Sequence, residues 1–104
     1  MDSFTALADP TRRRIIEYLA AAPQLPAGDI AARFTLSKPA ISQHLNALKA
    51  ANLVTVEVRG QQRIYRLNRE GLDEMDQWIA RTRAHWTQAL DRLETLLNSE
   101  NPHE

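Results

Sequence analysis

The sequence predicts a mainly α-helical fold that carries a single β-hairpin before its last helix. Three observations predict it. Apolar residues recur at three- and four-residue steps through the first half of the chain, as they do on the buried face of a helix. Over residues 53–67 the apolar period changes to two, which is typical of strands. A helical period then returns and continues to about residue 99.

The segment before the hairpin predicts four helices, and proline and capping residues mark their ends. Asp9 is an expected N-cap and is followed by proline at the first helical position, while Ser37 is the expected N-cap of the fourth helix. Pro23 and Pro26 bracket a short linker. The predicted helices cover residues 3–8, 10–22, 27–34 and 38–51.

Residues 27–51 contain two predicted helices whose apolar faces are spaced to pack on each other. The turn between them is three residues long, 35–37. Such a pair forms a helix-turn-helix, whose second helix enters the major groove of DNA with its N-terminal residues leading. Lysine bonds guanine acceptors, glutamine makes two hydrogen bonds to the major-groove edge of adenine, and serine adapts to either. The candidate reading residues are Ser37, Lys38, Ser42, Gln43 and His44, with Asn46 as a further candidate.

The hairpin that follows is the expected wing, because a hairpin directly after a helix-turn-helix defines the winged variant. Alternating valines predict its first strand over residues 53–58, and residues 63–67 predict the second. The polar loop 59–62 between them contains one glycine. Its arginines can lie along the DNA backbone or enter a narrow minor groove. The alternative is that the loop is a solvent-exposed turn without a DNA contact. The candidate contacts are Arg59, Gln61 and Arg63.

Residues 69–99 predict one long helix, asparagine-capped at residue 68 and about 45 Å long at 1.5 Å per residue. Its apolar residues form a partial heptad stripe. A small domain cannot bury so long a stripe, so a partner helix is expected. The candidate dimer interface comprises Phe4, Leu7, Leu72, Ile79, Trp86, Leu90, Leu93 and Leu97. The alternative is that Trp78, Ile79 and Trp86 pack only within the subunit.

The 104 residues are expected to form one winged helix-turn-helix domain over 1–99 and a disordered tail at 100–104. The net charge is zero, but basic residues outnumber acidic ones nine to five in residues 1–66. In residues 67–104 they are outnumbered four to eight. A basic half and an acidic half fit a protein that meets phosphate on one side only.

Several classes of function are excluded by what the sequence lacks. Without cysteine there is no thiolate metal ligand, disulfide or thiol redox sensor. No apolar run is long enough for a membrane span and no signal peptide is recognised, so the protein is expected to be cytoplasmic, with no membrane partner. No glycine-rich phosphate loop and no nucleophile–base–acid set is present. Neither an enzyme nor a cofactor is therefore predicted.

Three segments of the chain resemble ArsR/SmtB-type winged-helix transcriptional repressors. Residues 4–19 read FTALADPTRRRIIEYL, like the opening of that family, and residues 36–45 read LSKPAISQHL, like its recognition-helix signature. Residues 53–67 match its wing, so the resemblance covers essentially the whole chain. The resemblance implies a homodimer that binds an imperfect inverted repeat in double-stranded DNA. By position, it assigns DNA contacts to Ser37, Lys38, Ser42, Gln43, His44, Arg59 and Arg63.

The metal-sensing signatures of that family are missing. The third helix has no cysteine, and the family's last-helix ligand spacing, begun at Asp73, falls on Met75, Trp86 and Ala89. His44, His85 and His103 are expected to lie far apart. The chain thus resembles the subgroup without an evident metal site, and any inducer is unidentified. A protein-interaction module and a sensor of an unknown ligand or metal remain as alternatives.

Overall fold

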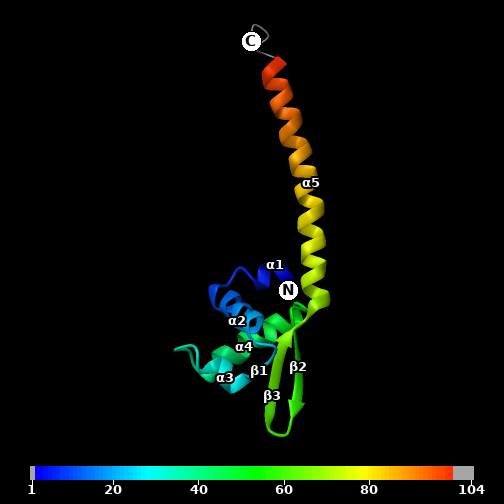
Figure 1. The fold of residues 1–104 in the computed structure, drawn as a ribbon. Coiled ribbons are helices and arrows are strands. Elements are labelled where there is room, and N and C mark those ends of the chain that lie inside the picture. The colour runs from blue at the N-terminus through cyan, green and yellow to red at the C-terminus, as the bar shows by residue number, and fades with distance from the viewer. Residues whose placement is uncertain (1, 100–104) are drawn as a thin grey trace. The chain divides into compact units, whose positions relative to one another are not determined.

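The computed structural model describes residues 2–99 and confirms the predicted fold class (Figure 1). The helices and strands, in chain order, are α1 (Ser3–Ala6), α2 (Pro10–Ala21), β1 (Leu25–Pro26), α3 (Ala27–Ala31), α4 (Lys38–Ala50), β2 (Val54–Arg59), β3 (Gln62–Leu67) and α5 (Arg69–Ser99). The chain divides into two compact units, residues 1–73 and residues 74–104. The predicted tail lies outside the described residues.

The predicted caps of α2 and α4 are present. The Asp9 carboxylate accepts a hydrogen bond from the backbone N–H of Arg12 at 3.1 Å, and the Ser37 hydroxyl accepts one from Ala40 at 3.2 Å. Both helices have proline in the first turn, where a missing N–H costs nothing. These local signals place the start of α4 at Lys38, as expected.

The predicted end of α3 is wrong. The helix was expected to reach Phe34 but ends at Ala31, and the chain continues through tight turns to Ser37. The Phe34 ring instead packs edge-to-face on Tyr18, with 5.7 Å between the ring centroids. The connection from α3 to α4 is therefore longer than the three residues expected, and Phe34 within it contacts α2.

The linker between α2 and α3 contains a strand that the sequence analysis did not predict. Leu25 and Pro26 form β1, which pairs antiparallel with β3, so that the sheet has three strands in the order β1-β3-β2. Two residues are too few to display an alternating pattern. The side chain of Leu25 is buried, which fixes the start of α3 beside the sheet.

The turn of the wing is shorter than expected. Arg59 pairs with Gln62, so only Gly60 and Gln61 connect β2 to β3. Gly60 has a φ of +60°, a conformation that glycine adopts without strain at the first central position of such turns. Because side chains alternate along a strand, Arg59 and Arg63 project from opposite faces of the hairpin.

The core of residues 1–73 joins the helices to the inner positions of the sheet. Its largest fully buried side chains are Ile15, Ile30, Ile41, Leu45, Leu48, Leu53 and Val54. Tyr65 of β3 belongs to the same core and is 3% exposed. The buried face of α4 is therefore the predicted one, and the opposite face is left to solvent.

The start of α5 is joined to the end of α4 through Asn52. This residue has a φ of +65°, in the left-handed region that asparagine tolerates better than most residues. The side-chain nitrogen of Asn68 donates to the backbone carbonyl oxygen of Asn52 at 3.0 Å and to the Oδ1 atom of Asn52 at 2.9 Å. The backbone of the buried Gly71 lies directly against the Asn52 carbonyl. The side-chain amide of Asn68 thus connects the segment before α5 to the segment after α4.

In residues 74–99, α5 presents a row of exposed apolar side chains. Trp86 is 65% exposed, and Ile79, Leu90, Leu93 and Leu97 are all at least two-fifths exposed. Along the part of the chain that the structure describes, no helix combines the length and apolarity needed to cross a bilayer.

Candidate nucleic-acid interface

The N-terminal half of α4 presents a polar face. Ser37, Lys38, Ser42 and Gln43 are all exposed, while Ile41, between them in sequence, is buried. Burial of the Ile41 stripe fixes the rotation of the helix, so the hydroxyl and amide side chains point to solvent. These are groups that can bond base edges and phosphate oxygens. Asn46 continues the exposed face one turn further on.

His44 differs from the other candidate residues of α4 because its ring faces α2. Its Nδ1 atom lies 3.4 Å from Nη1 of Arg12 and 3.9 Å from the Asp9 carboxylate, and its side chain is 20% exposed. Arg12 also donates from Nε to the carbonyl oxygen of Ala6. His44 therefore links the recognition helix to the N-terminus of α2.

Asp9 is the acidic member of this contact. Burial raises the pKa of the Asp9 carboxyl, but the hydrogen bond from the Arg12 N–H and the charge of His44 outweigh it, so the pKa lies below 3.8. The carboxylate caps α2 and faces α4 at once. The ionised form is therefore the one that the fold stabilises.

The two arginines of the wing have different surroundings. Nη2 of Arg59 lies 2.7 Å from Oε2 of Glu57, which also accepts a bond from Arg66 at 2.9 Å. The side chain of Arg63, on the other face and opposite Val58, makes neither a hydrogen bond nor an ion pair within residues 2–99. Its guanidinium is thus available to a partner, whereas that of Arg59 is already paired.

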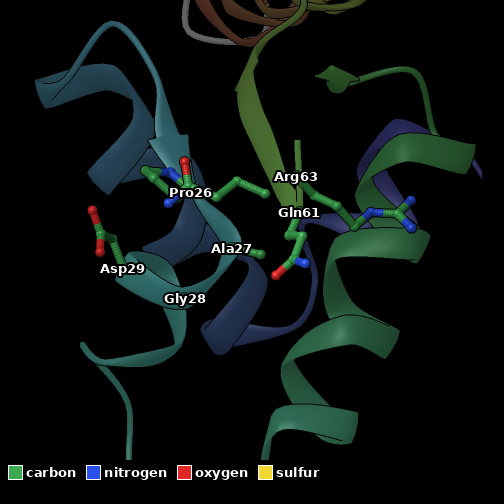
Figure 2. Close-up of a pocket in the computed structure, with 7 residues that line it drawn as sticks. Pro26, Ala27, Gly28, Asp29, Gln61 and Arg63 are labelled. Atoms are coloured by element: carbon green, nitrogen blue, oxygen red, sulfur yellow. The ribbon is translucent and has the colours of Figure 1, made fainter. Parts of the chain in front are cut away.

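A pocket of about 330 Å³ separates the wing tip from the start of α3. Figure 2 shows Gly28 and Ala27 along it, with Asp29 on one side and the Arg63 side chain on the other. A second pocket, of about 210 Å³, lies between α3 and α4. Its lining includes Lys38 and Ser42, and it shares Ala27 and Gly28 with the first.

We call these two adjacent pockets the hollow. Four residues that line it, Lys38, Ser42, Gln61 and Arg63, are predicted DNA contacts, whereas the sequence did not single out the Ala27–Gly28 segment. A glycine inside a predicted helix, where it costs about 1 kcal/mol relative to alanine, was the available signal. Gly28 has open space around it, with no atom within 4 Å of an added Cβ.

A second feature that the sequence did not predict is a stack of cations on aromatic rings. The guanidinium carbon of Arg14 lies 5.2 Å from the Phe34 ring centroid, and that of Arg33 lies 5.2 Å from the Tyr18 centroid. Arg14 also donates to the Tyr18 hydroxyl at 3.0 Å. These contacts link α2 to the connection that precedes α4.

The residues predicted for a dimer interface are distributed over both units. In the first unit, Phe4 is 42% exposed, and Leu7 and Leu72 are partly buried. Ile79, Trp86, Leu90, Leu93 and Leu97 lie in the second unit, and Trp78 and Leu96 belong to the same exposed apolar set. Within residues 2–99, no cluster of three or more potential His, Asp or Glu ligands is found. His103 lies outside them.

The exposed polar face of α4, its buried counterpart and the hairpin after it define a winged helix-turn-helix DNA-binding protein. A family model described as a helix-turn-helix domain matches residues 7–57. The HTH-type transcriptional regulator Rv2034 of Mycobacterium tuberculosis is 42% identical over 98 residues, which cover 94% of this chain and 88% of that protein. The transcriptional repressor SdpR of Bacillus subtilis is 43% identical over 76 residues, 73% of this chain and 83% of SdpR.

Solved structures show the same fold. An ArsR-like transcriptional regulator from Rhodococcus sp. RHA1 superposes with a TM-score of 0.76 at 33% identity, covering 89% of this chain and 87% of that one. The chain belongs to the ArsR/SmtB-type family of winged helix-turn-helix regulators. It is a DNA-binding transcriptional regulator.

Proposed function

We propose that this protein is a homodimeric repressor that binds an inverted-repeat operator in double-stranded DNA. The observation that carries the proposal is the outward face of α4, where Ser42 and Gln43 are exposed next to the buried Ile41. Ser37 and Lys38 precede them at the helix start. A helix that presents donors and acceptors at its N-terminal half fits the major groove.

In the wing, Gln61 and Arg63 are the proposed contacts to the adjacent minor groove or its backbone. The Arg63 guanidinium has no hydrogen-bond or ion-pair partner within residues 2–99, and the residue lies beside the exposed Val58. Arg59 contacts DNA only by giving up or sharing its ion pair with Glu57. We therefore propose that Arg63 contributes more than Arg59 to the affinity of the wing for DNA.

We assign His44 a positioning role. Its ring lies against Arg12 and Asp9, so it holds α4 on α2. Loss of His44 weakens binding to all sequences in proportion, whereas loss of Gln43 changes the preference for particular bases. This assignment replaces the direct DNA contact expected from position alone.

The homodimer is supported by the exposed apolar row on α5. A dimer sets two recognition helices about 34 Å apart, the repeat of one DNA turn. We propose Phe4, Leu7, Leu72, Ile79, Trp86, Leu90, Leu93 and Leu97 as the interface. Acting on chromosomal DNA, the protein works in the cytoplasm, and no catalytic role or cofactor is proposed for it.

Binding to a labelled duplex from the region upstream of its own gene tests the proposal. Wild type is expected to bind with an affinity that falls steeply with salt, since phosphate contacts release counterions. Gln43→Ala combined with Arg63→Ala is expected to abolish the shifted band. Undiminished binding by that double variant would contradict the site, and a flat salt response would contradict the electrostatic mechanism.

The runner-up is a winged-helix module that binds another protein. Lys38, Gln43 and Arg63 at the exposed reading positions favour DNA over an apolar protein partner. A wild-type protein that binds no genomic fragment in a selection experiment would favour this alternative.

A further inference from the structure

We infer that a pocket beside the first turn of α5 binds a small zwitterion with an aliphatic body, of which an aliphatic amino acid is the simplest case. The pocket has a volume of about 260 Å³. It is lined by Leu67, Arg69, Leu72 and Asp73, all of which belong to the first compact unit. None of the candidate DNA contacts lines it, so this ligand site is separate from the proposed DNA interface.

Two opposite charges in this pocket do not pair with each other. Arg69 and Asp73 are four residues apart on α5, a spacing that makes their side chains neighbours on the helix surface. Within residues 2–99, neither the guanidinium of Arg69 nor the carboxylate of Asp73 makes a hydrogen bond or an ion pair. Since both line the same pocket, a ligand that carries a carboxylate and an ammonium can pair with both at once.

The charge of the lining is balanced. Glu70 and Glu74, the neighbouring acids of α5, do not line the pocket, which therefore carries one charge of each sign. A ligand with two charges of the same sign would place one of them beside a like charge, which disfavours binding. A zwitterion matches both sides, so the lining favours this class of ligand.

Two leucines determine the body of the ligand. The side chains of Leu67 and Leu72 are half-buried, and both contribute to the pocket lining. Ligand pockets are mostly apolar, with a few polar groups that fix orientation, and their volumes are about 300–1,000 Å³. At about 260 Å³ this pocket is smaller, so it fits a compact aliphatic molecule rather than a peptide or a nucleotide.

The turn that carries the pocket is held in place by contacts outside it. Asn68 donates to the backbone carbonyl of Asn52, and Gly71 lies against the same carbonyl. The lining residues of α5 therefore start from a fixed backbone, which lowers the ordering cost of binding. The same contacts join this turn to the segment that directly follows α4.

Binding of L-leucine to the full chain tests the inference, with the methyl NMR signals of Leu67 and Leu72 as the readout. Saturable shifts of both signals are expected, with an affinity in the millimolar range or tighter. The absence of a saturable shift would overturn the site.

Three analogues test the ligand class. Leucinamide lacks the carboxylate, N-acetylleucine lacks the ammonium, and glycine lacks the aliphatic body. Each is expected to bind about threefold more weakly than leucine or worse, which is the scale of one exposed ion pair or a few buried methyl groups. An analogue that binds as tightly as leucine would show that the group it lacks is not recognised, and the zwitterion class would then be wrong.

Two variants assign the charges. In Arg69→Gln, leucine and leucinamide are expected to bind equally well, because the partner of the carboxylate is gone, while N-acetylleucine remains weaker. In Asp73→Asn, leucine and N-acetylleucine are expected to become equal, while leucinamide remains weaker. Arg13→Gln and Asp29→Asn make the same charge changes at exposed positions of α2 and α3 and are expected to keep the wild-type order. Unchanged preferences in the variants at positions 69 and 73 would overturn the assignment.

Leu72 also belongs to the proposed dimer interface, so a ligand and a partner subunit would use the same side chain. This consequence rests on the proposed function. Saturating leucine is expected to shift sedimentation equilibrium toward the monomer, as reciprocal linkage requires. If leucine binds and the dimer is unaffected, the pocket stands and Leu72 is not part of the interface. If the protein binds leucine with these preferences but binds no DNA, the proposed function fails and the pocket stands.

Discussion

The backbone carbonyl of Asn52 occupies the space in which a side chain on Gly71 would begin. A Cβ atom added to Gly71 collides with that oxygen, so the first turn of α5 can lie against the end of α4 only because residue 71 has no side chain. Asn68 reinforces the contact by donating to the same carbonyl. The recognition helix and the start of α5 are thereby held in one fixed arrangement.

Gly71→Ala is expected to lower the free energy of unfolding by about 1–3 kcal/mol, as overpacked sites do. Urea denaturation at one protomer concentration measures it. Gly28→Ala is the matched control, because the added Cβ meets no neighbour within 4 Å. If both changes have the same effect on stability, the Asn52–Gly71 contact is not what residue 71 is needed for.

Asp9 makes stability depend on pH. Its carboxyl has a pKa below 3.8 in the folded protein, because the bond from the Arg12 N–H and the charge of His44 outweigh the effect of burial. A lowered folded pKa contributes stability that is fully present above pH 3.8 and is lost as the pH falls through the folded value.

Asp9→Asn is the variant that isolates this charge, since asparagine also caps helices well. Its melting temperature is expected to be below that of wild type at neutral pH and to approach it in acid. A constant difference over the whole range would show that the carboxylate acts only as a cap.

Glu57 neutralises part of the positive charge on one face of the wing. Its carboxylate is paired with both Arg59 and Arg66, so Glu57→Gln frees two guanidinium groups for phosphate. Exposed pairs are worth about 0.2–1 kcal/mol, which corresponds to about 1.4-fold to fivefold tighter binding of non-specific DNA. Fluorescence anisotropy at several salt concentrations measures it. Glu17→Gln, the same charge change at an exposed position of α2, is expected to have less effect.

Leu93 tests the dimer. Leu93→Glu puts a charge into the exposed apolar row of α5 and is expected to weaken self-association at least tenfold in sedimentation equilibrium. Gln88→Glu adds the same charge on another face of the helix, about 140° away at 100° per residue, and is expected to leave the dimer intact. A dimer unaffected by Leu93→Glu would place the interface elsewhere.

The elements that could be predicted from sequence are those specified by local chemistry. Ser37 and Asp9 mark helix starts through side-chain caps, and the apolar period of α4 fixes which residues are buried. The strand β1 could not be predicted, because Leu25 pairs with Tyr65, forty residues further along the chain, and has no pattern of its own. Tertiary contacts decide such pairings.

For the candidate site, the sequence predicts which residues are exposed on α4 better than it predicts where their side chains point. Lys38, Ser42 and Gln43 are exposed as expected, but His44 turns toward Arg12, a contact across thirty-two positions. Arg59 and Arg63 look equivalent in sequence, and the register of a two-residue turn puts them on opposite faces. Neither the packing of α4 on α2 nor that register can be inferred from spacing alone.

The register of the wing also limits how such a protein can evolve. Arg63 and Val58 share one face of the hairpin, and Glu57, Arg59 and Arg66 share the other. Inserting one residue in either strand would exchange the two faces of that strand and send the unpaired guanidinium to the opposite side. Lineages that lengthen this wing to reach further along a groove are therefore expected to add residues in cross-strand pairs and to preserve the turn at Gly60.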